Sequence, residues 1–89
     1  MAKDSIFTVT IYTKPYCPFC VLAKDLLTRR GIEYQEILVN DDDDVQWQRL
    51  EKLSGMKTMP QIFHKDKLIG GYNELNELDQ KTRLVNLKS

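Results

Sequence analysis

The sequence has no excess of charge of either sign, because thirteen basic and thirteen acidic residues cancel. This balance argues against non-specific nucleic-acid binding, which needs clustered lysine and arginine to displace counterions. No apolar run approaches the ~20 residues that a membrane-spanning helix requires. The N-terminal segment 1–5 contains an acidic residue and no apolar stretch long enough for a signal peptide. We therefore expect a cytoplasmic protein that binds neither nucleic acid nor membranes.

The sequence also lacks internal repeats and low-complexity linkers. Its length of 89 residues fits one domain, and its apolar content of 42% is ordinary for a globular protein. A chain this short buries only a modest core. We expect a single domain over residues 1–89, present as a monomer.

Cysteine is scarce, and the two that occur lie three residues apart in Cys17-Pro18-Phe19-Cys20. The pair stands between an apolar segment, 9–12, and an amphipathic segment, so it is expected at the start of a helix. A helix N-terminus carries partial positive charge and unpaired N–H groups, which favour the reactive thiolate. In the reducing cytosol a cycling disulfide is more plausible than a permanent one. The motif therefore predicts dithiol–disulfide exchange.

Hydrophobic periodicity predicts the element order β-α-β-α-β-β-α, an α/β fold. Strands are expected at 8–13, 33–39, 61–64 and 67–69, and helices at 18–30 and 44–53, with a last helix marked by Leu75, Leu78, Thr82 and Val85. The first βαβ crossover makes its strands parallel, and the last two strands form an antiparallel hairpin. The result is a four-stranded mixed sheet with helices on its faces.

Four consecutive aspartates, 41–44, precede the second predicted helix. Acidic residues favour a helix N-terminus, and Asp43 with Gln46 can form a capping box. The alternative is a calcium loop, but an EF-hand needs alternating ligands and a distal glutamate. We therefore expect a helix cap here.

The position of each cysteine predicts its role. Cys17 is expected at the N-cap, Pro18 at the first helical position, where proline is favoured, and Cys20 one turn further in. Cys17 would then be the exposed, attacking thiol, and Cys20 the more buried, resolving thiol. Lys14 precedes the turn and can add a cation that helps Cys17 ionise. Thiols in such settings typically have a pKa of about 3.5–7.5.

Three other interpretations of the cysteine pair are open. The pair could be half of a zinc site, but four ligands are usual and His64 is the one histidine in the sequence. It could be a permanent structural disulfide, but a disulfide that closes so small a loop stabilises the fold little. Two unrelated buried cysteines would not explain the position at a helix start.

Pro60 stands where the third strand is expected to begin, a position that tolerates proline. One interpretation is that the proline only marks the start of the strand. The other is a cis bond before Pro60, which would turn the backbone of Met59 outward to pair with an extended ligand. The residues alone leave both interpretations open.

Three motifs together resemble the dithiol glutaredoxins. Residues 12–20 resemble their active site, residues 58–63 their threonine–x–cis-proline strand, and residues 70–75 the glycine pair that opens their last helix. The motifs occur in the family's order and spacing, and they span nearly the whole chain. The resemblance implies a thioredoxin-like fold and glutathione-dependent oxidoreductase activity. It also implies glutathione as a co-substrate and no tightly bound cofactor.

The resemblance places glutathione in a groove beside Cys17. Lys14 would meet its glycine carboxylate, and the backbone of residues 58–59 would pair with its cysteine. Asn73 and Glu74 would hold its γ-glutamyl end, although helix capping explains these two residue types equally well. The groove residues that the resemblance implies are Lys14, Tyr16, Thr58, Met59, Pro60, Gly71, Tyr72, Asn73 and Glu74.

The sequence departs from the family pattern at four positions. Phe19 replaces the more frequent tyrosine, Met59 stands where valine is common, and Glu74 stands where aspartate is usual. Trp47 falls near a position where the family often has a polar residue facing the glycine carboxylate. Arg49 is a candidate to replace that residue.

The activity implied by the resemblance is the reduction of protein–glutathione mixed disulfides by Cys17, and of protein disulfides by Cys17 together with Cys20. The expected protein partners are glutathionylated and disulfide-containing proteins, with ribonucleotide reductase among the candidates. One rival is a redoxin coupled to thioredoxin reductase, against which the groove residues argue. The other is an iron–sulfur carrier, a dimer ligated by Cys17 and glutathione, which Pro18 disfavours by stiffening the turn.

Overall fold

The computed structural model describes residues 8–81 of the chain. In chain order its elements are β1 (Val9–Thr13), α1 (Pro18–Arg29), β2 (Tyr34–Leu38), α2 (Asp44–Ser54), β3 (Gln61–His64), β4 (Lys67–Gly70) and α3 (Tyr72–Gln80). This order confirms the predicted β-α-β-α-β-β-α arrangement. Thr82 and Val85, which were expected on the last helix, lie outside the described residues.

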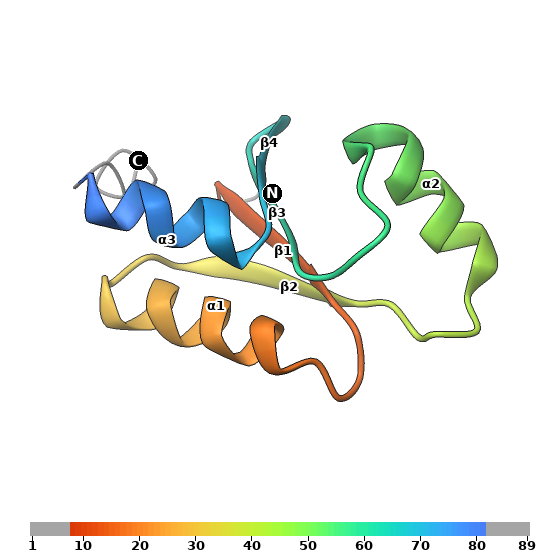
Figure 1. Ribbon diagram of the computed structural model, residues 1–89, viewed down its shortest axis with the longest axis horizontal. Helices are drawn as coiled ribbons and strands as arrows, with labels where there is room; N and C mark the ends of the chain where they lie inside the picture. The colour runs from red at the N-terminus through yellow and green to blue at the C-terminus, as the bar shows by residue number, and fades with distance from the viewer. Residues whose placement is uncertain (1–7, 82–89) are drawn as a thin grey trace, which may run out of the picture.

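The four strands form one mixed sheet in the order β2-β1-β3-β4. β1 runs parallel to β2, with Val9 opposite Tyr34, and antiparallel to β3, with Ile11 opposite Ile62. β3 and β4 form the predicted antiparallel hairpin. Figure 1 shows α1 and α3 lying together, with α2 at the other end of the molecule.

The two faces of the sheet bury different clusters, because successive strand residues point to opposite sides. On one side Val9, Ile11 and Ile62 pack against apolar residues of α1 and α3. On the other side Tyr12 packs against a smaller cluster formed by Cys17, Cys20, Val39, Leu50 and Met59. The turn that holds the two cysteines therefore packs against the sheet through this smaller cluster, called the smaller core below.

Both ends of α2 follow the sequence prediction closely. Asp43 is the N-cap, and its Oδ1 accepts the Gln46 backbone N–H at 3.3 Å. This confirms that the aspartate run caps a helix. Gly55, at φ 74°, ends the helix in the left-handed conformation that glycine adopts without strain. No helix within residues 8–81 is long and apolar enough to cross a membrane.

Glu36 of β2 is hydrogen-bonded to residues of β1 and α1 near the cysteine turn. Its Oε2 accepts the Thr13 hydroxyl at 2.7 Å and the Lys24 ammonium at 3.0 Å. Burial raises the pKa of Glu36, but the two hydrogen bonds and the Lys24 charge together outweigh it, so the pKa lies below its usual value.

We predict that Glu36→Gln lowers the free energy of unfolding at neutral pH by roughly 0.2–1 kcal/mol, the range for partly exposed ion pairs. A carboxylate with a depressed folded pKa stabilises the fold above its unfolded pKa of about 4.3, and the effect is lost as pH falls through the folded value. Urea unfolding of both proteins at neutral pH and in acid measures this difference. A difference that stays constant into acid would contradict an ionic role.

Candidate functional site

The turn between β1 and α1 places the two sulfurs at the start of a helix, as predicted. Cys17 is the N-cap of α1, in an extended conformation, and Pro18 follows at the first helical position. The Cys17 sulfur accepts the backbone N–H of Cys20 at 3.2 Å. The structure joins the two cysteines by a disulfide, with their Cα atoms 5.2 Å apart.

The expectation that Cys17 forms an exposed tip is wrong. Cys17 is 7% exposed and Cys20 is 2% exposed, so both are buried. The cause is long-range packing, because the loop before β3 brings the Met59 carbonyl oxygen within 3.8 Å of the Cys17 sulfur. The two cysteines differ instead in what they border.

A cavity of about 580 Å³ opens beside Cys17, and a hollow of about 460 Å³ lies at the same turn. Cys17 lines both, whereas Cys20 lines the smaller hollow and not the cavity. The volume of the cavity suits a small-molecule ligand. A ligand in it therefore meets the sulfur of Cys17, not that of Cys20.

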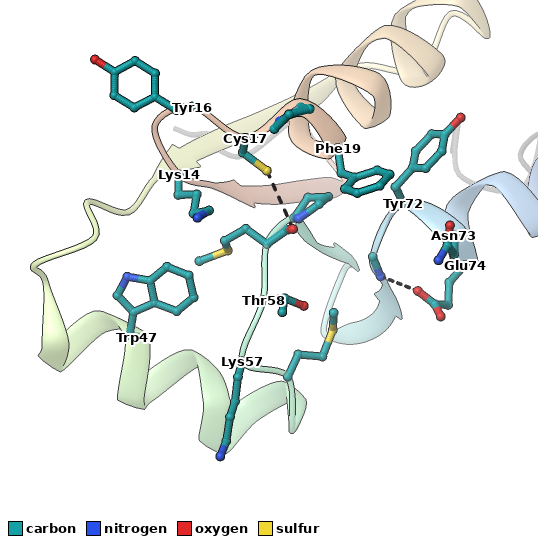
Figure 2. A pocket seen from close by; sticks show the side chains of 15 residues that line it. Lys14, Tyr16, Cys17, Phe19, Trp47, Lys57, Thr58, Tyr72, Asn73 and Glu74 are labelled. Atoms are coloured by element: carbon teal, nitrogen blue, oxygen red, sulfur yellow. Dashed lines mark hydrogen bonds between the residues drawn. The ribbon is translucent and has the colours of Figure 1, made fainter.

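Three chain segments and one helix wall the cavity (Figure 2). They are the cysteine turn, the loop between α2 and β3, the start of α3, and Trp47 of α2. The lining residues are Lys14, Tyr16, Cys17, Pro18, Phe19, Trp47, Met56, Lys57, Thr58, Met59, Pro60, Gly71, Tyr72, Asn73 and Glu74. All the groove residues that the resemblance implies are among them, whereas the further candidate Arg49 is not.

The loop between α2 and β3 forms the wall that faces Cys17. The peptide bond between Met59 and Pro60 is cis, which is the second of the two interpretations that the sequence allowed. Met59 is itself 7% exposed and belongs to the smaller core.

The start of α3 forms the end of the cavity that lies opposite Trp47 (Figure 2). The N-cap is Gly71, whose N–H donates to Glu74 Oε1 at 2.8 Å (Figure 2). Helix capping therefore accounts for one carboxylate oxygen of Glu74. Asn73, which follows Tyr72 at the first turn, also borders the cavity.

The charged side chains of the cavity are not equivalent. Lys14 points toward the cavity, and its Nζ lies 4.0 Å from Asp41 Oδ1 (Figure 2). The amino group of Lys57 points away from the cavity and lies 3.8 Å from Glu51 Oε2. Of the two lysines that line the cavity, Lys14 is thus the one whose side chain points into it.

Two expected residues lie differently from their prediction. Tyr16 borders the cavity, but the residue is 99% exposed and its ring points away from the cavity (Figure 2). Arg49 is exposed and is not among the lining residues. Trp47 lines that part of the cavity instead, with its indole N–H donating to the Asn40 carbonyl at 3.0 Å.

The sequence reasoning missed Met56, Lys57 and the packing of Phe19. Met56 and Lys57 directly precede Thr58, so their place in the loop was the available signal. Phe19 and Tyr72 stack with ring centroids 6.1 Å apart and join the first turns of α1 and α3. Neither residue carries a pattern that would have paired them.

We predict that Cys17 of the reduced protein has a pKa well below the free-thiol value of about 8.5. The main cause is the N-terminus of α1, including the Cys20 N–H that points at the sulfur. Lys14 contributes less, so Lys14→Ala should raise the Cys17 pKa modestly without restoring the free value. The rate of alkylation measured against pH gives this pKa.

A matched control is Lys57→Ala, which removes the same charge from a side chain that points away from the cavity. It should change the alkylation profile less than Lys14→Ala does. A wild-type midpoint near that of free cysteine would refute the electrostatic account of the turn.

Comparison with known proteins identifies similar sequences and folds. The family model described as Glutaredoxin matches residues 9–69. Glutaredoxin of Neisseria meningitidis serogroup A is 36% identical over 80 residues, which cover 90% of this chain and 94% of that protein. Glutaredoxin 1 of Rickettsia prowazekii is 38% identical over 88 residues, covering 98% and 93%.

Solved structures of the same kind superpose closely. A buckwheat glutaredoxin–glutathione complex has a TM-score of 0.83 and 29% identity, and covers 91% of this chain and 76% of that one. The glutaredoxin of Brucella melitensis has a TM-score of 0.80 and 36% identity, covering 98% and 95%. The element order and mixed sheet are thus those of a thioredoxin-like fold.

Proposed function

Because this chain belongs to the glutaredoxin family, we propose that it is a glutathione-dependent thiol–disulfide oxidoreductase acting on protein–glutathione mixed disulfides and on protein disulfides. One observation carries the proposal. Cys17, at the N-cap of α1, borders a cavity that is also lined by all the groove residues that the resemblance implies.

In the first step the Cys17 thiolate attacks the glutathione sulfur of a mixed disulfide. A bond forms between Cys17 and glutathione, the bond to the protein sulfur breaks, and the protein thiolate leaves and takes up a proton. In the second step a glutathione thiolate attacks the glutathione sulfur of this adduct. Glutathione disulfide leaves, and the Cys17 thiolate is restored, so the electrons come from glutathione.

The cavity supplies complementary groups along an extended tripeptide. Lys14 meets the glycine carboxylate, and the backbone at Met59 pairs with the cysteine of glutathione. Asn73 and the first turn of α3 hold the γ-glutamyl end, since a helix N-terminus favours a carboxylate. The related buckwheat protein was solved as a complex with glutathione, which supports a ligand of this class.

For a protein disulfide, Cys20 acts second. Cys17 attacks one substrate sulfur and forms a mixed disulfide, and the other substrate thiolate leaves. The Cys20 thiolate then attacks the Cys17 sulfur and releases the second substrate thiolate, leaving Cys17 and Cys20 joined. The disulfide of this structure corresponds to that product. We place these reactions in the cytoplasm, with the protein acting as a monomer.

A coupled assay tests the proposal. Reduced glutathione, glutathione reductase and NADPH should sustain reduction of a glutathionylated peptide by this protein. Thioredoxin reductase and NADPH without glutathione should not. Turnover with thioredoxin reductase alone would favour the rival redoxin, and a coloured, iron-containing protein on purification would favour the cluster carrier.

A further inference from the structure

Gln61, the first residue of β3, is fully buried, yet it carries a polar side chain. Its Nε2 donates to two backbone carbonyl oxygens, those of Met56 at 3.3 Å and Thr58 at 3.2 Å. Both carbonyls belong to the loop between α2 and β3, which forms one wall of the cavity. Gln61 does not line the cavity itself, so it contacts the loop on the side away from the cavity.

These bonds set the direction of the peptide between Thr58 and Met59. Met59–Pro60 is the one cis peptide bond among residues 8–81. The preceding peptide, between Thr58 and Met59, is therefore trans. In a planar trans peptide the C=O and N–H point in opposite directions. Because the Thr58 carbonyl oxygen accepts a hydrogen bond from Gln61, the Met59 N–H points away from the Gln61 side chain.

We infer that Gln61 is a positioning residue that aims the Met59 N–H at the main chain of bound glutathione. The inference rests on the proposed function, and it assigns a role to a residue that does not contact the ligand. An extended ligand pairs with such a backbone group as an added strand does. Loss of the Gln61 donor would free the peptide to rotate and would misdirect the N–H.

The choice of glutamine is hard to explain by packing alone. A buried amide costs free energy unless its polar atoms are bonded. The Oε1 of Gln61 is buried and has no hydrogen-bond partner among residues 8–81. An apolar side chain of similar length would fill this space without that cost, so the value of glutamine lies in its Nε2 donor.

A second anchor of the loop provides a matched control. Ser54 Oγ accepts the Met56 N–H at 3.0 Å and donates to the Leu50 carbonyl at 2.9 Å. Ser54 therefore fastens the start of the loop to α2 but does not bond to Thr58. Ser54→Ala removes an anchor without releasing the Thr58–Met59 peptide.

The test measures two equilibria in a Cys20→Ser background. In the first, the Cys17 thiolate reacts with glutathione disulfide to give the Cys17–glutathione adduct and free glutathione thiolate. In the second, it reacts with bis(2-hydroxyethyl) disulfide, which has no peptide backbone to pair with Met59. Gln61→Met should lower the first constant about fivefold, the effect of one hydrogen bond, and leave the second unchanged. Ser54→Ala should change neither constant by as much.

Several results would overturn the inference. Equal losses with both disulfides would mean a damaged Cys17 site, and no loss with either would mean that Gln61 has no such role. An equal, glutathione-selective loss in Ser54→Ala would assign the effect to the loop as a whole. If Gln61→Met does not fold, Gln61→Leu serves in its place. A parent protein with no preference for glutathione disulfide would instead sink the proposed function, and the inference with it.

Discussion

We expect Cys17→Ser to abolish all thiol–disulfide exchange, and we expect Cys20→Ser to retain the reduction of glutathione mixed disulfides and to lose the reduction of protein disulfides. The reason is the placement of the two sulfurs. Cys17 lines the cavity and accepts a helix N–H, and Cys20 does not line the cavity. Release of glutathione needs one protein thiol and free glutathione, and a protein disulfide needs both thiols.

Two assays on the same preparations measure this difference. One follows release of glutathione from a glutathionylated peptide, and the other follows reduction of a protein disulfide. Thermal unfolding of each variant confirms that it is folded. Loss of deglutathionylation in a folded Cys20→Ser protein would contradict the role assignment, as would residual exchange by Cys17→Ser.

We expect Gly70→Ala to lower the free energy of unfolding by about 2–4 kcal/mol, the sum of a strained backbone and an overpacked site. Gly70 has φ +127°, a conformation that L side chains rarely adopt. A Cβ there would lie 2.7 Å from Glu74 Cγ and 2.9 Å from Glu74 Cβ. The added methyl would therefore displace the side chain that caps α3 at the cavity.

The neighbouring glycine is the matched control for this substitution. A Cβ on Gly71 would meet the Pro60 carbonyl oxygen at 3.4 Å and Glu74 Oε1 at 3.5 Å, which are ordinary contacts. Its backbone is extended, so Gly71→Ala should cost no more than about 1 kcal/mol through the weaker N-cap. Urea unfolding compares the two variants, and equal stability would show that the strain at Gly70 is not real.

Local patterns in the sequence were sufficient for the order of the elements. The apolar spacing along residues 19–27 predicted α1, although Phe19 and Leu22 are exposed in it. Asp43 marked the start of α2. Both signals act within a few residues. Strand ends were less accurate. The last strand was expected at residues 67–69, but β4 extends to Gly70.

The parts of the site that the sequence did not predict depend on long-range packing. The burial of Cys17 comes from Met59, which lies 42 residues away in the chain. The outward direction of the Tyr16 ring and the position of Trp47, rather than Arg49, in the cavity wall depend on how the segments meet. The position of the cysteine pair at a helix start was predictable, because residue type and the neighbouring sequence determine it locally.

The most direct test of the central claim is mass spectrometry of Cys20→Ser mixed with a glutathionylated peptide. We predict glutathione attached to Cys17 and the free peptide thiol, followed by loss of the adduct and formation of glutathione disulfide when glutathione is added. The peptide attached to Cys17 in place of glutathione, or no adduct at all, would contradict a cavity that selects glutathione.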